Sequence, residues 1–220
     1  MEKMKGLEKG LWLLILLLTA VTIYAVFFLV PPAKGLGSLV RIAFFHIPVA
    51  WISVLAFLVS AVYAAGYLRK PSLHRDFVSA ESAKLGLLFV VMATVSGAYF
   101  SKLTWGAYWN WDPRQTTIFV LLLIYAAYLT LRAAIPDARR RARASAIYAL
   151  FSFLTVPFLV FLIPRFYFSL HPTPVLNGSG SLDMDPVMFR VLLLAVLDMS
   201  LIYIAALRHS VKAKEVRHEA

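Results

Sequence analysis

Six long apolar segments dominate this 220-residue sequence and restrict what it can fold into. A helix needs about 20 predominantly apolar residues to cross the hydrocarbon core of a bilayer, and each segment is close to that length. Hydrophobic residues make up 61% of the chain, against roughly 45–50% in soluble domains. We therefore expect an all-α fold, namely a polytopic integral membrane protein in which residues 1–220 form a single membrane domain. The six expected spans cover residues 11–30, 43–68, 79–100, 116–135, 146–164 and 187–207.

The first span is long for the apolar core of a signal peptide and lacks a convincing cleavage site, so we expect it to be retained as a helix. Most Lys and Arg residues lie near the two termini and in the connections at 69–78 and 132–145. Because cytoplasmic loops carry the excess of basic residues, this pattern predicts that both termini are cytoplasmic. The net charge of +11 is then a property of membrane loops and does not indicate nucleic-acid binding. The outer side is expected to carry only Lys34, Arg41, Lys102, Arg114, Arg165 and Arg190.

A cluster of tryptophans lies in the outer segment predicted at 101–115. Residues 105–114 read W-G-A-Y-W-N-W-D-P-R, which places Trp105, Tyr108, Trp109 and Trp111 within seven residues. Their spacing is too close for one helical stripe, so we expect an irregular or amphipathic segment. A belt of interfacial aromatics is one interpretation. A belt needs only one or two aromatics at a helix end, however, and the density here favours a flat apolar surface for a ligand.

The end of this cluster has the pattern of a helix start. Asp112 is a suitable N-cap and Pro113 suits the first helical position, and the pair recurs as Asp185 and Pro186 before the sixth span. Arg114 would lie in the first turn, where the helix dipole disfavours a cation. It could pair with Asp112, extend toward the interface or bind an anionic group, and the sequence does not decide between these.

Two of the five histidines, His46 and His171, are expected on the outer side, on either side of the tryptophan cluster in the sequence. Two imidazoles, an aromatic surface and nearby arginines suit haem, which needs axial nitrogen donors, apolar contacts and cations for its propionates. The chain has no cysteine, which excludes disulfides, thiolate metal sites and thioether attachment, so any haem would be bound non-covalently.

Three charged residues are predicted inside the spans. Glu81 and Lys84 have the spacing of an ion pair on one helix face. Asp198 lies near the middle of the sixth span without an obvious partner, so that it could pair with Lys84 or stay protonated.

The segment W-G-A-Y-W-N-W-D-P-R-Q-T resembles the WWD motif of the haem-handling membrane proteins of cytochrome c maturation. The resemblance covers nearly the whole chain, including six spans and one outer histidine on either side of the motif. It implies haem b held non-covalently at the outer face of the cytoplasmic membrane, with His46 and His171 as axial ligands of the iron. The positions that it implies as haem contacts are Trp105, Gly106, Tyr108, Trp109, Trp111, Asp112 and Arg114.

The same resemblance implies a non-enzymatic role in haem export. The haem would pass to a membrane-anchored haem chaperone, CcmE, with the small protein CcmD and the ABC transporter components CcmA and CcmB as further partners. Two positions depart from the family pattern, since Tyr108 replaces a tryptophan and Pro172 replaces a common glutamine. The alternatives are a cytochrome b-type electron-transfer subunit, which usually has histidine pairs within its spans, and a solute transporter using Asp198, which predicts repeats that we do not find.

Overall fold

The computed structural model describes residues 2–171 and 184–219. Six of its helical segments are long and apolar enough to cross a membrane, which confirms the predicted fold class. Large apolar side chains such as Leu16, Val95 and Phe151 are about two-thirds exposed, as expected for side chains that face lipid. The helices in chain order are α1 (Glu2–Tyr24), α2 (Ala43–Arg69), α3 (Leu73–Trp105), α4 (Pro113–Ala134), α5 (Ala138–Pro157), α6 (Ile163–Phe166) and α7 (Pro186–Glu219).

Three short helical segments of other types complete these spans. A π-helical turn, η1 (Ala25–Leu29), extends α1, and a 3₁₀ turn, η2 (Ser38–Ile42), leads into α2. A second π-helical segment, η3 (Phe158–Leu162), joins α5 to α6 directly after Pro157. Proline removes a backbone donor and crowds the preceding turn, so a π-type distortion at this point has a local cause.

Several helices extend beyond the apolar segments that predicted them. On the side predicted to be cytoplasmic, the connections shrink to residues 70–72 and 135–137. Side-chain caps define these helix starts, since Ser72 accepts a hydrogen bond from the Arg75 N–H (3.3 Å) and Asp137 accepts one from the Arg140 N–H (2.7 Å). The predicted spans ended earlier because hydropathy marks only the part of a helix that lies in lipid, and the basic residues beyond it are also good helix formers.

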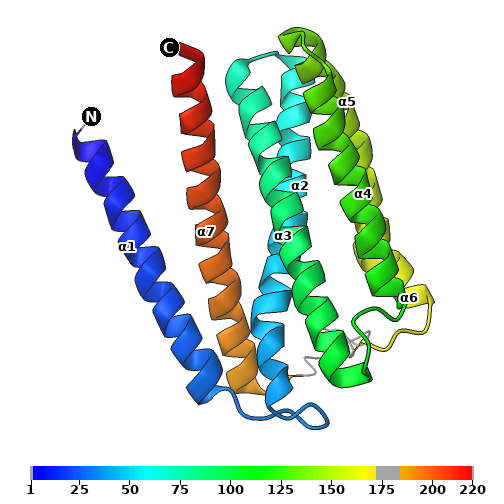
Figure 1. The fold of residues 1–220 in the computed structure, drawn as a ribbon. Coiled ribbons are helices and arrows are strands. Elements are labelled where there is room, and N and C mark those ends of the chain that lie inside the picture. The colour runs from blue at the N-terminus through cyan, green and yellow to red at the C-terminus, as the bar shows by residue number, and fades with distance from the viewer. Residues whose placement is uncertain (1, 172–183, 220) are drawn as a thin grey trace.

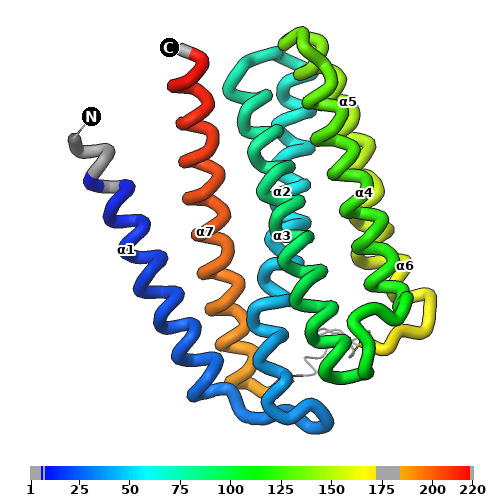
Figure 2. The backbone as a smooth tube through the Cα atoms, in the orientation of Figure 1, coloured from blue at the N-terminus to red at the C-terminus, as the bar shows by residue number. Residues whose placement is uncertain are grey.

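The helices α2, α3, α4 and α5 pack together around a shared apolar core, and α7 packs against α2 and α3 (Figure 1). The helix α1 lies at the edge of the molecule along α7. This core contains large buried side chains of α2, α4 and α5, including Phe57, Leu121, Tyr125 and Val156. The beginning of α1 and the end of α7 lie at one end of the bundle, and the connections at 30–42, 106–112 and after α6 lie at the other (Figure 2).

Charged side chains within the bundle make three contacts. Lys84 Nζ lies 2.9 Å from Glu81 Oε1, which confirms the predicted pair. Asp198 is 2% exposed and accepts a hydrogen bond from the Thr19 hydroxyl at 2.9 Å, so it joins α7 to α1 and does not pair with Lys84. Arg132, in the last turn of α4, makes two hydrogen bonds to the Asp76 carboxylate, and its side chain is largely buried.

Candidate functional site

A cavity of about 130 Å³ lies between α2, α3, α4 and the α5–α6 region, at the end of the bundle that carries the 106–112 connection. Its walls include four of the residues singled out in the sequence, namely His46, Trp109, Arg114 and His171. Small residues of α2 and α3, among them Ala50, Ala93 and Gly97, also line it. The fold therefore brings both candidate histidines, one tryptophan and one cation to the same space.

His46 lies at the end of the first turn of α2 and contacts α3. Its Nδ1 atom is 3.0 Å from the Ser96 hydroxyl. A Cβ atom added to Gly97 would lie only 3.0 Å from His46 Cε1, so the imidazole packs directly on the glycine backbone. The close approach of α2 and α3 thus determines where this ring lies in the cavity wall.

His171 follows α6 at the end of a short extended segment. Its Nδ1 atom is 3.2 Å from Asp112 Oδ1, although the ring N–H is not aligned for a hydrogen bond, and the Trp105 ring packs against the imidazole with centroids 5.4 Å apart. Burial lowers the pKa of His171 to about 4, an effect to which Arg114 and His46 add and which Asp112 partly opposes. The imidazole is therefore neutral at pH 7, the form in which a ring nitrogen can bind a metal.

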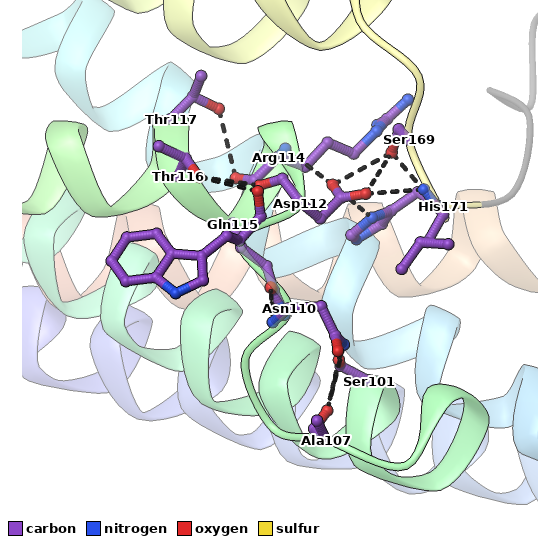
Figure 3. A network of polar contacts seen from close by, with 12 residues as sticks. Ser101, Ala107, Asn110, Asp112, Arg114, Gln115, Thr116, Thr117, Ser169 and His171 are labelled. Carbon is purple, nitrogen blue, oxygen red and sulfur yellow. Dashed lines mark hydrogen bonds and ion pairs between the residues drawn. The ribbon is translucent and has the colours of Figure 1, made fainter.

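Asp112 connects the tryptophan segment to the segment that carries His171 (Figure 3). It caps α4 by accepting the Arg114 N–H at 2.9 Å, and it also accepts the Leu170 N–H at 2.7 Å and the Ser169 hydroxyl at 3.0 Å. Burial alone would raise the pKa of Asp112, but these hydrogen bonds outweigh it and hold the pKa below its usual value. With its carboxylate used in this way, Asp112 does not line the cavity.

Arg114 presents a cation to the cavity. The Asp112 carboxylate takes its backbone N–H, and the guanidinium Nε atom is buried without a hydrogen-bond partner among the residues that the structure describes. A buried donor of this kind usually has a partner, so its position fits an anionic group entering the cavity.

The aromatic residues of the connection divide into an inner and an outer set. Trp105 contacts His171, and Trp109 lines the cavity and packs edge-on against Phe119. The outer set is exposed: Trp111 is 72% exposed with its backbone at φ 54°, and Tyr108 is 59% exposed. The rings of Trp109 and Trp111 are perpendicular, so the cluster does not form the single flat surface that the sequence suggested.

The path of this connection depends on Gly106, which the sequence analysis named as a haem contact, and on Asn110 and Gln115, which it did not single out. Gly106 ends α3 in a left-handed conformation (φ 85°) that glycine adopts without strain. The Asn110 side chain donates to the Ser101 hydroxyl at 2.7 Å, and the Asn110 N–H donates to Gln115 Oε1 at 2.8 Å. Gln115 in turn donates to the Tyr108 carbonyl at 3.2 Å. The signal available in the sequence was the group of polar side chains, Asn110 and Gln115, on both sides of the D-P helix start.

The chemistry of the cavity fits haem, whereas its volume is small. Two histidines, a buried guanidinium and an indole ring match what haem iron, propionates and macrocycle require. The volume of about 130 Å³ is below the roughly 300–1,000 Å³ of typical cofactor pockets. A bound macrocycle would therefore lie partly outside the cavity or would require the surrounding segments to move outward.

Comparison with known proteins places the chain among proteins of cytochrome c maturation. The family model described as "Heme exporter protein C" matches residues 2–220. The Heme exporter protein C of Bradyrhizobium diazoefficiens is 30% identical over 193 residues, which is 86% of this chain and 73% of that protein. The protein of the same name from Rhodobacter capsulatus is 25% identical over 205 residues, 87% of this chain and 81% of its own length. The "Cytochrome c biogenesis protein CcsA" of Arabidopsis thaliana is 38% identical over 81 residues, 37% of this chain and 24% of its own length.

Proposed function

Because the chain belongs to the Heme exporter protein C family, we propose that it binds haem b non-covalently at the end of the bundle that carries the tryptophan segment and transfers it onward. Its family places the multi-pass membrane protein in haem handling for cytochrome c maturation. The binding site and the transfer step are our proposal. The observation that carries it is that His46 and His171, from opposite halves of the chain, reach one cavity beside Arg114.

Four residues of the cavity wall have a proposed role. His46 and His171 supply the two axial nitrogen donors, and burial keeps His171 neutral for this purpose. Arg114 binds a propionate, and Trp109 packs against the macrocycle. Bound in this way, haem is cargo, and the protein acts as a binding and transfer protein and not as an enzyme.

The proposed partners follow from the family and from the exposed aromatic side chains. Trp111 and Tyr108 lie at the surface next to the cavity, where a second protein can contact them while it receives the cargo. We assign this contact to the haem chaperone CcmE. The small protein CcmD and the ABC transporter components CcmA and CcmB are the further proposed partners.

The proposed topology places residues 1–220 in the cytoplasmic membrane as a single membrane domain, with both termini inside and the cavity facing outward. It rests on the excess of Lys and Arg at the end of the bundle where α1 begins and α7 ends. A topology reporter fused after Ala220 tests it directly. Activity of a reporter that works only outside the cytoplasm would reverse the orientation of the site.

The binding proposal is tested by visible spectroscopy of the purified protein supplied with haem. We expect a low-spin six-coordinate spectrum for the wild type, altered in His46→Ala and in His171→Ala. His74→Ala is the control, because His74 pairs with Glu215 at the other end of the bundle. An unchanged haem spectrum and affinity in the double variant of His46 and His171 would overturn the ligand assignment.

A further inference from the structure

Ser96 lies on α3 directly behind the His46 imidazole, and its hydroxyl has three close neighbours. The Met92 carbonyl oxygen is 2.8 Å away, the Ala93 carbonyl oxygen is 3.1 Å away and His46 Nδ1 is 3.0 Å away. The two carbonyls precede Ser96 by four and three residues, which is the usual pattern for a serine that bonds to its own helix.

The single hydroxyl proton of Ser96 decides whether Ser96 donates or accepts the hydrogen bond with His46. A serine hydroxyl has a single proton to donate, and a carbonyl oxygen can only accept. If the proton went to His46 Nδ1, the Ser96 and Met92 oxygen atoms would face each other at 2.8 Å with no proton between them. The favourable arrangement is donation from Ser96 to the helix carbonyls, which leaves its oxygen to accept from His46 Nδ1–H.

This arrangement assigns the tautomer of His46. A neutral imidazole carries its proton on one nitrogen and a lone pair on the other, and the partner of the first nitrogen determines which is which. With the proton on Nδ1, the lone pair lies on Nε2. Histidines that bind metals usually donate their second ring N–H to a neighbouring group, which also orients the ring.

We propose that Ser96 is a positioning residue for haem binding: it holds His46 in the Nδ1–H tautomer, so that Nε2 is the atom that binds the iron. The inference rests on the proposed function of the cavity, and it adds a residue outside the tryptophan motif. Gly97 supports the same arrangement, because any larger residue would press on the Cε1 edge of the ring.

The chain offers well-matched variants for the test. Ser96→Ala removes the acceptor, whereas Ser96→Thr keeps a hydroxyl at the same place. Ser96 borders an open apolar hollow lined by Phe45 and Val95, on the side of α3 where an added methyl group can lie. The control is Ser200→Ala, since Ser200 is also half-buried and donates to the carbonyl four residues earlier, at 2.6 Å, and has no hydrogen bond to a histidine among the residues that the structure describes.

Two measurements read out the proposal. The first is the ¹⁵N NMR spectrum of the histidine side chains in the haem-free protein, in which His46→Ala identifies the His46 signals. We expect His46 to be protonated on Nδ1 and unprotonated on Nε2. Ser96→Ala should remove this preference. The second is haem affinity, which we expect to fall by about 10- to 100-fold in Ser96→Ala, the usual range for loss of a group that orients a metal ligand. Ser96→Thr should recover most of this loss, and Ser200→Ala should bind haem like the wild type.

The outcomes separate this inference from the proposed function. A proton on Nε2 of His46 in the wild type, or unchanged haem affinity in Ser96→Ala while His46→Ala loses it, would overturn the role of Ser96. Failure of the wild type to bind haem would overturn the proposed function and the iron-binding role of Nε2 with it. The ¹⁵N measurement needs no haem, so it decides the Ser96–His46 hydrogen bond in either case.

Discussion

Replacement of Asp112 by alanine should release the segment that carries His171 while leaving the bundle folded. The Asp112 carboxylate is 4% exposed and ties this segment down through the Leu170 N–H (2.7 Å) and the Ser169 hydroxyl (3.0 Å). A hydrogen bond to a charged group contributes about 1.5–3 kcal/mol, so the two bonds together contribute about 3–6 kcal/mol. Since each 1.4 kcal/mol is a factor of about ten, local opening of the segment should become roughly 100 to 10,000 times more frequent.

Hydrogen–deuterium exchange of the purified, haem-free protein measures this opening. The Leu170 amide is expected to exchange faster in Asp112→Ala by the factor above, while amides in the middle of α2 and α3 stay protected. Asp185→Ala is the matched control: Asp185 also precedes a proline and caps a helix, and among the residues that the structure describes its side chain accepts hydrogen bonds only from that helix start, the Val187 N–H at 2.8 Å and the Met188 N–H at 3.2 Å. Loss of such a cap costs about 1 kcal/mol and should leave Leu170 unchanged. Equal exchange at Leu170 in the wild type and Asp112→Ala would refute the reasoning.

Three further predictions concern Arg114, Gly97 and Arg132. Arg114→Gln should remove the preference of the protein for haem over haem dimethyl ester, which lacks free propionates. The control Arg190→Gln, at an exposed arginine, should bind with the wild-type preference. An undiminished preference in Arg114→Gln would contradict the role of Arg114 in binding a propionate. Gly97→Ala should weaken haem binding, because the new Cβ displaces the His46 ring. It should not lower the thermal stability, because alanine in a helix is favoured over glycine by up to about 1 kcal/mol. A variant that binds haem like the wild type would count against this packing. Arg132→Ala should lower the free energy of unfolding by about 3–5 kcal/mol, because it leaves the buried Asp76 carboxylate unpaired. Unfolding in detergent measures this loss. A loss below about 1 kcal/mol would show that the pair of Arg132 and Asp76 contributes little to stability.

The architecture was largely predictable because its main causes are local. A bilayer requires each span to be apolar and to satisfy its own backbone hydrogen bonds, so six apolar segments give six helices whatever their later packing. The helix starts at Pro113 and Pro186 were also predictable from the sequence, because a capping aspartate and a proline stabilise the helical turn in which they lie. The pair of Glu81 and Lys84 follows from helical spacing alone.

The predictions failed or stayed open where the direction of a side chain depends on another helix. Hydropathy does not state how far a helix is rotated about its axis, and packing against neighbours sets that rotation. Asp198 meets Thr19 because α7 packs on α1, and the tryptophans divide into an inner and an outer set because polar side chains such as Asn110 and Gln115 shape their connection.

The amino-acid sequence by itself determined the number of spans, the helix starts and the presence of two histidines on either side of an aromatic cluster. Only the tertiary structure decided that His46 and His171 share a cavity, and that Ser96 and Asp112 lie beside their Nδ1 atoms. The physical reason is that these contacts join residues far apart in the chain. They arise from the close approach of α2 to α3 and from the hydrogen bonds of one buried carboxylate, which no local pattern encodes.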